Sequence, residues 1–128
     1  MGVEFDLIFG LHSIAAALTN PRRVHQKLVA TDEGLRELQR KHQLNPKHLN
    51  VQVELLSSHQ LQENAKRLCS YLDVEFTRVP SQIYIQTAPL ETYTIQEFLS
   101  RPNTRLLALD QITDVHNGAA ILRSACFY

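Results

Sequence analysis

Polar side chains that can take part in catalysis gather near the carboxyl end of the sequence. Arg123 carries a fixed positive charge, which can hold an anion such as a phosphate. We expect a helix that begins near Gly118, so that Arg123 lies within its first two turns, where backbone N–H groups also favour an anion. Two simpler roles stay open, since Arg123 can pair with Asp110 or Asp114 and Asn117 can cap the helix.

Two histidines are further candidates, because imidazole is a common general base near neutral pH. His12 lies at the start of an expected helix, where capping or packing is the simpler role. His116 belongs to the loop that precedes Gly118. We therefore assign neither histidine to a catalytic step.

A basic segment lies between Asn20 and His48. Its charge is +4 and that of the remainder is −4, although the whole chain has a net charge of zero. A local positive patch attracts an anionic partner such as nucleic acid, whereas the simpler alternative is a solvated helix face. The bases of this segment are Arg22, Arg23, Lys27, Arg36, Arg40, Lys41 and Lys47.

Composition is that of a globular domain. The 128 residues are 44% hydrophobic and 20% charged, which excludes a disordered chain, a collagen-like repeat and a coiled coil. No stretch approaches the roughly 18 apolar residues of a membrane span. The first six residues carry two acids and no base, unlike a signal peptide, so we expect a cytoplasmic protein. Cys69 and Cys126 form no paired motif, which predicts reduced thiols and no metal site.

Helices and strands alternate along the first ninety residues. Helices are expected at 12–18, capped by His12 or Ser13, and at about 34–42, capped by Thr31. Another follows Ser57 or Ser58 with Leu61, Ala65 and Leu68 on one face, and Thr94 and Glu97 open a fourth with a capping box. Expected strands are 27–30, 51–55 with one buried face, and 83–85. This order predicts a layered α/β domain with a parallel or mixed sheet.

The segment after Asn103 has a different pattern. Leu106–Asp110 is a continuous apolar run, typical of a strand buried on both faces. A polar loop, 111–117, and the helix from Gly118 follow. A doubly buried strand needs neighbours, so the sequence predicts a second domain that is truncated at Tyr128.

The stretch Asn117-Gly118-Ala119-Ala120-Ile121-Leu122-Arg123-Ser124-Ala125 resembles the first motif of the SpoU (TrmH-type) RNA ribose methyltransferases, Asn-x-Gly-Ala-Ile-x-Arg-x-Ala. Earlier parts match too. Phe9-Gly10-Leu11-His12 resembles the opening of the family's substrate-binding domain, and 81–93 resembles the strand and Pro-Leu linker that close it. Two positions depart from the pattern: Ala119 replaces the family's glycine, and only Gln82 matches its His-Gln-Gly. The sequence resembles the branch that methylates guanosine in 23S ribosomal RNA.

The resemblance implies a three-layer α/β/α sandwich with a mixed sheet, similar to ribosomal RNA-binding proteins, followed by the start of a knotted α/β methyltransferase domain. It divides the chain into an RNA substrate-binding domain (1–88), a linker with a short helix (89–104) and a truncated methyltransferase domain (105–128). In the family, S-adenosylmethionine binds two later motifs that these residues lack, so we expect this chain to bind none. The family forms homodimers through the catalytic domain, so the given residues are expected to be monomeric.

The resemblance also implies roles for individual residues. Arg123 would act at the ribose 2′-hydroxyl near the RNA phosphate, and Asn117 would orient the ribose or the arginine. Phosphate contacts would come from the basic segment and base readout from Gln82. The RNA-binding residues are then Arg22, Arg23, Lys27, Arg36, Arg40, Lys41 and Gln82.

Three functions are consistent with the sequence. The first is the substrate-binding part of a SpoU-type 2′-O-methyltransferase that acts on ribosomal RNA, with transfer RNA as a second possibility. The second is a stand-alone RNA-binding module without catalysis. The third is a protein-interaction domain that contacts its partner through the apolar segment 105–128.

Overall fold

A mixed four-stranded sheet organises the amino-terminal part of the chain. The computed structural model describes residues 4–24, 26–49 and 51–126. The strands are β1 (Asp6–Phe9), β2 (Lys27–Ala30), β3 (Gln52–Leu55) and β4 (Ile83–Thr87). Their order is β1-β4-β2-β3; β2 and β3 are parallel, and β4 is antiparallel to both β1 and β2.

Five α-helices lie within the described residues, so the fold is α/β with a four-stranded mixed sheet. They are α1 (Leu11–Thr19), α2 (Asp32–His42), α3 (Ser58–Tyr71), α4 (Ile95–Leu99) and α5 (Val115–Ala125). Two short 3₁₀ helices, η1 (Pro46–His48) and η2 (Pro80–Gln82), precede β3 and β4. The chain divides into two compact units, Met1–Glu91 and Thr92–Tyr128.

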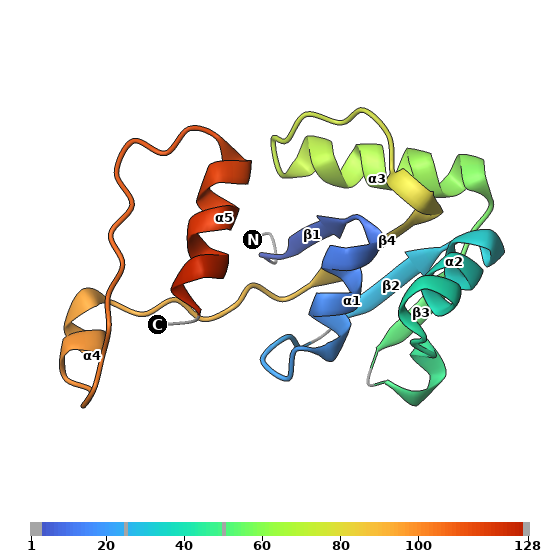
Figure 1. Cartoon of the computed structure of the whole chain (residues 1–128). Helices are drawn as coiled ribbons and strands as arrows, with labels where there is room; N and C mark the ends of the chain where they lie inside the picture. Colours follow the sequence, from blue (N-terminus) through green and yellow to red (C-terminus); the bar gives the residue numbers. More distant parts are fainter. Residues whose placement is uncertain (1–3, 25, 50, 127–128) are drawn as a thin grey trace. The chain divides into compact units, whose positions relative to one another are not determined.

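Helices cover both faces of the sheet (Figure 1). On one face α1 and α2 pack against β2 and β4 around Ile14, Leu28 and Leu38, which are fully buried. On the other face α3 packs through Leu61 and Ala65. The predicted mixed α/β sheet is therefore confirmed, with a separate apolar cluster on each face.

Capping explains several helix starts. The Oγ1 atom of Thr31 accepts from Gly34 N at 3.1 Å, and Ser57 forms a capping box with Gln60. These two predictions are confirmed, as is the capping box of Thr94. The predicted cap of α1 by His12 or Ser13 is wrong. Gly10 is its N-cap, with φ at 91° and no side-chain bond, a conformation that glycine adopts without a Cβ clash.

Strand β3 departs from prediction in its burial. Val53 and Leu55 are 37% and 53% exposed, so the expected buried face is wrong. Their partners across the ladder are Leu28 and Ala30, which do lie beneath α1 and α2. Because β3 pairs only with β2 and forms an edge of the sheet, the helix layer ends before it reaches these side chains.

The second unit contains α4, α5 and an extended segment. The predicted strand at 106–110 is wrong: residues 104–110 have no regular structure, and Leu106 and Leu107 are more than half exposed. A strand needs a ladder partner, and the described part of this unit holds none. Around α4, Arg101 lies over the rings of Tyr93 and Phe98 at 4.9 and 5.3 Å. Among the described residues, no helix is long and apolar enough to cross a membrane.

The first prediction concerns Gly34 in α2. A Cβ there would overlap the Gln82 carbonyl oxygen and lie 3.0 Å from the Gln82 carbonyl carbon, both backbone atoms with little room to move. We expect Gly34→Ala to lower the free energy of unfolding by about 1–3 kcal/mol, although alanine favours helix. Urea denaturation followed by circular dichroism measures this. Gln39→Ala, an exposed control in the same helix, should change stability little; equal values for both variants would contradict the close packing.

The second prediction concerns Tyr84. Burial, aided by the charge of Glu54, raises the pKa of its phenol to about 12. An unfolded tyrosine titrates at about 10, so this stabilisation is complete below pH about 10 and is lost as the pH rises through about 12. We expect the free energy of unfolding to fall over that window and that of Tyr84→Phe to fall less.

Urea titrations at several alkaline pH values compare the two proteins. Burial also raises the pKa of the Cys69 thiol, which both proteins retain. Identical slopes in wild type and Tyr84→Phe would contradict the assignment.

Candidate nucleic-acid interface

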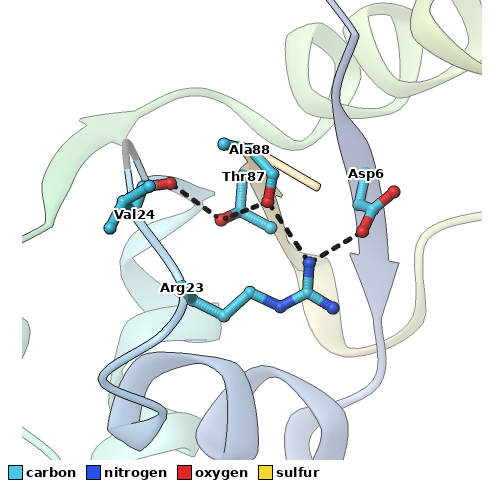
Figure 2. A network of polar contacts seen from close by, with 5 residues as sticks. All are labelled: Asp6, Arg23, Val24, Thr87 and Ala88. Carbon is cyan, nitrogen blue, oxygen red and sulfur yellow. Dashed lines mark hydrogen bonds and ion pairs between the residues drawn. The ribbon is translucent and has the colours of Figure 1, made fainter. Parts of the chain in front are cut away.

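Arg23, one of the predicted phosphate ligands, is committed to the fold (Figure 2). Its Nη1 atom lies 2.7 Å from Oδ2 of Asp6 in β1 and donates to the carbonyl of Ala88 at 3.3 Å. The Arg23 side chain is only 14% exposed. Next to it, the Val24 carbonyl accepts from Thr87 Oγ1 and from Ala88 N. Arg23 therefore fastens the α1–β2 connection to the edge of the sheet.

Lys27 is also paired. Its Nζ atom lies 2.6 Å from Oε2 of Glu54, and both side chains are 39% exposed. The pair joins β2 to β3 diagonally across the face that α3 partly covers. Lys27 is therefore a weaker phosphate ligand than its charge alone suggests, since Glu54 already neutralises it.

Helix α2 presents the predicted bases that are most accessible. Arg36, Arg40 and Lys41 are all exposed. Arg40 pairs with Glu37 at 2.8 Å, a surface pair three residues apart that is worth little. Arg36 and Lys41 make no ion pair with any described residue. Both can therefore contact phosphate without losing an intramolecular partner.

The strand topology brings further bases to one end of the sheet, at the amino ends of β2 and β3. Because β2 and β3 are parallel, α2 and η1 must return the chain to the amino end of β3. The last turn of α2, with Arg40 and Lys41, and Lys47 on η1 consequently lie toward that end. Exposed Arg22 lies in the connection that enters β2 at its amino end. Lys47 belongs to the basic segment but not to the predicted RNA-binding residues, and the parallel pairing is what adds it to the site.

Gln82, the predicted reader of bases, joins two elements of the fold. Its Oε1 atom accepts from Thr31 Oγ1 at 2.9 Å, and its carbonyl accepts from Thr31 N at 3.1 Å. Ser81 and Gln82 both have positive φ, 57° and 54°, which directs that carbonyl toward the start of α2. The side chain is half-buried and already bonded, so its nearest role is structural.

The predicted catalytic residues both lie inside α5. The helix begins at Val115 and Asp114 is its N-cap, accepting from His116 N at 2.8 Å, so the predictions of a start near Gly118 and of Asn117 as the cap are wrong. The reason is local: Asp114, three residues earlier, caps the N–H group of His116 and starts the helix there. Arg123 lies in the last turn rather than the first two. Six residues of helix separate Asn117 from Arg123 by roughly 9 Å of rise and about 120° of rotation, so they project from different faces.

His12 and His116 both lie in helices. His12 is exposed, caps nothing and packs edge-to-face on His42, with ring centroids 4.8 Å apart. His116 lies in the first turn of α5 instead of the loop. Among the described residues, no three His, Cys, Asp or Glu side chains are grouped to hold a metal ion. Cys69 is buried and Cys126 is exposed, and both are free thiols.

One hollow that the sequence did not point to lies on the sheet face beside the end of α3. It comprises two adjoining cavities of about 370 Å³ each, which share Phe5 and Gln86. Lys27 and Gln52 line one cavity, and Arg67 and Tyr71 line the other. The available signal was the alternation in β4, where polar Gln86 interrupts the apolar residues of one face.

No family model, curated protein or solved structure matches this chain.

The third prediction tests the role of Arg23. We expect Arg23→Ala to lower the free energy of unfolding by about 1–3 kcal/mol, because Asp6 and the Ala88 carbonyl lose a charged donor. The RNA affinity of the folded protein should change by less than about twofold, since phosphate contacts are made by exposed cations. Thermal denaturation and fluorescence anisotropy with a labelled RNA hairpin measure the two quantities. If Arg23→Ala left the free energy of unfolding unchanged but weakened RNA binding severalfold, Arg23 would instead be an RNA-binding residue.

Proposed function

We propose that the unit Met1–Glu91 binds structured RNA, ribosomal RNA foremost, through the basic surface at the amino ends of β2 and β3. The supporting observation is that exposed bases from three segments, Arg22, Lys41 and Lys47, lie toward this end of the sheet, with exposed Arg36 on the same helix as Lys41. The acids of that helix are Asp32 and Glu33 in its first turn and half-exposed Glu37. We call this set, Arg22, Arg36, Lys41 and Lys47, the basic surface. Cations that lack an intramolecular partner bind phosphate at the least cost, since no existing pair is broken.

The same reasoning predicts that the basic surface contributes affinity for RNA but little specificity for its sequence. Lysine and arginine contacts to phosphate fix orientation and bring salt dependence, whereas bases must be read by other groups. Gln82 is bonded to Thr31 and half-buried, so we assign it a supporting role and not base readout. Arg23 and Lys27 hold the fold together next to the surface.

We further propose that this RNA-binding unit serves a SpoU-type, S-adenosylmethionine-dependent ribose 2′-O-methyltransferase. The support is the agreement of five of the six specified motif positions between Asn117 and Ala125, together with the resemblances near Gly10 and at 81–93. A mixed sheet with helices on both faces is compatible with the three-layer sandwich of that family's first domain. In the family's scheme Arg123 would stabilise the developing alkoxide and Asn117 would orient the ribose or the arginine.

S-adenosylmethionine does not fit the residues described in the second unit. Residues 104–110 form no strand, and Asn117 and Arg123 project from different faces of α5. We therefore derive no methyl-transfer step from these residues. The same observation favours the alternative in which this chain acts as an RNA-binding module without catalysis.

The fourth prediction tests the basic surface. We expect Arg36→Ala/Lys41→Ala to weaken binding of an RNA hairpin about tenfold or more, because two phosphate contacts are removed. The slope of log K against log salt should fall by roughly 1.4 to 1.8 for these two contacts. Fluorescence anisotropy over a range of salt concentrations measures both.

A matched control removes the same charge elsewhere. Lys66 on α3 and Arg78 before η2 are exposed and lie outside the basic surface, so Lys66→Ala/Arg78→Ala should leave affinity within about threefold. Equal losses in the two double variants would mean that only net charge matters. If neither double variant lost RNA affinity, the bases of α2 would form only a solvated helix face and the proposal would be refuted.

A further inference from the structure

The hollow beside the end of α3 is floored by polar side chains. Residues paired directly across strands point to the same face, so Leu7, Gln86, Lys27 and Gln52 form one row across the four strands. The neighbouring row contains Tyr84 and Val29, both buried beneath α3. Helix α3 therefore covers one row of this sheet face and leaves the next row accessible.

Two aromatic rings form a wall of the hollow. Phe5 and Tyr71, the last residue of α3, stack with centroids 5.8 Å apart and an interplanar angle of 11°. Tyr71 is 60% exposed and lines the hollow, where a ligand can reach it. A planar, polarisable group is the natural ligand for an aromatic face, because stacking places its ring parallel to the tyrosine.

The floor offers hydrogen-bonding groups that the fold does not use. The side chains of Gln52 and Gln86 make no hydrogen bond to any described residue, and each amide both donates and accepts. The Lys27–Glu54 pair beside them is internally neutralised. A planar ligand with donors and acceptors along its edge suits this floor better than a purely apolar one.

The charged residues at the rim differ between the two cavities of the hollow. Arg67 beside Tyr71 uses Nη2 to donate to Asn64 at 2.8 Å, which leaves its remaining N–H groups for an anion. Glu4 lies at the opposite cavity and disfavours an anion there. A ligand that joins a planar heterocycle to a phosphate would therefore stack on Tyr71 with its phosphate toward Arg67.

We propose that this hollow binds the base of an unpaired RNA nucleotide, stacked on Tyr71 with its edge at Gln86 and its phosphate near Arg67. The RNA origin of the base rests on the function proposed above; the base site itself rests on the hollow alone. The hollow lies at the amino ends of β2 and β3 on the face of the sheet that α3 covers, whereas α2 packs on the other face, so one RNA would reach both the hollow and the basic surface by passing around this end of the sheet. Stacking on aromatic side chains and amide contacts to base edges are the usual means of recognising unpaired RNA.

A single tryptophan gives a direct test, since the chain contains none. In full-length Tyr71→Trp we expect an RNA hairpin with an unpaired loop to quench indole emission. The quenching should saturate at the RNA concentration at which anisotropy saturates, and a fully paired duplex of the same length should not quench. Adding Gln86→Leu should weaken quenching by the loop about three- to tenfold, because the amide contacts are lost.

The control is Leu55→Trp, which puts an exposed tryptophan on the opposite face of the sheet, beside Ala30. Neither RNA should quench it. Tyr71→Ala in the otherwise unchanged chain should weaken loop binding about tenfold, and Tyr71→Phe should restore it, since both aromatic rings stack.

The outcomes separate this inference from the function proposed above. If the loop RNA binds by anisotropy without quenching the indole of Tyr71→Trp, or if the duplex quenches it equally, the base site is wrong and RNA binding stands. Adenosine and uridine monophosphates, tested alone at millimolar concentration, probe the hollow without a long RNA. Quenching by them when no RNA binds would retain the base site and reject the RNA function; no quenching by any probe would reject the inference.

Discussion

The alternation of side chains along β4 is the constraint on which the rest of the first unit depends. β4 is hydrogen-bonded on both sides, to β1 and to β2, and so lies inside the sheet. Ile83 and Ile85 enter the cluster beneath α1 and α2, whereas Tyr84 enters the cluster beneath α3. A shift of one residue in register would exchange these faces and place a phenol where α1 packs. The two helix layers are therefore positioned by a single short strand.

That strand also decides what the charged residues can do. Because β4 ends next to the start of β1 and to the loop before β2, Asp6, Arg23 and Ala88 meet at one corner, where Arg23 acts as a clamp. Arg36, thirteen residues further along the chain, faces solvent on α2. Residues of the same type in one basic segment thus have different surroundings, and the difference arises from tertiary contacts and not from local charge.

Local signals in the sequence were sufficient for most elements of the fold. The Thr31 and Ser57 caps and the apolar spacing of α3 are encoded within a few residues, so they were predicted correctly. Properties that depend on distant neighbours were not. The exposure of Val53 depends on how far α1 and α2 extend, and a strand at 106–110 depends on a ladder partner. In the candidate site, the exposed bases of α2 were predictable, but the ion pairs of Arg23 and Lys27 join segments that are distant in sequence.

The open polar row follows from where α3 ends. Leu61, Ala65 and Cys69 bury one side of the helix against the sheet, and Tyr71 closes its last turn by stacking on Phe5. A helix longer by one turn, about 5.4 Å, would extend over the next row of the sheet and cover Gln86 and Lys27. Since buried amides without partners are costly, glutamines at Gln86 and Gln52 are compatible with this fold only if water or a ligand reaches them. The polarity of this row is therefore compatible with the fold because α3 ends before it covers the row.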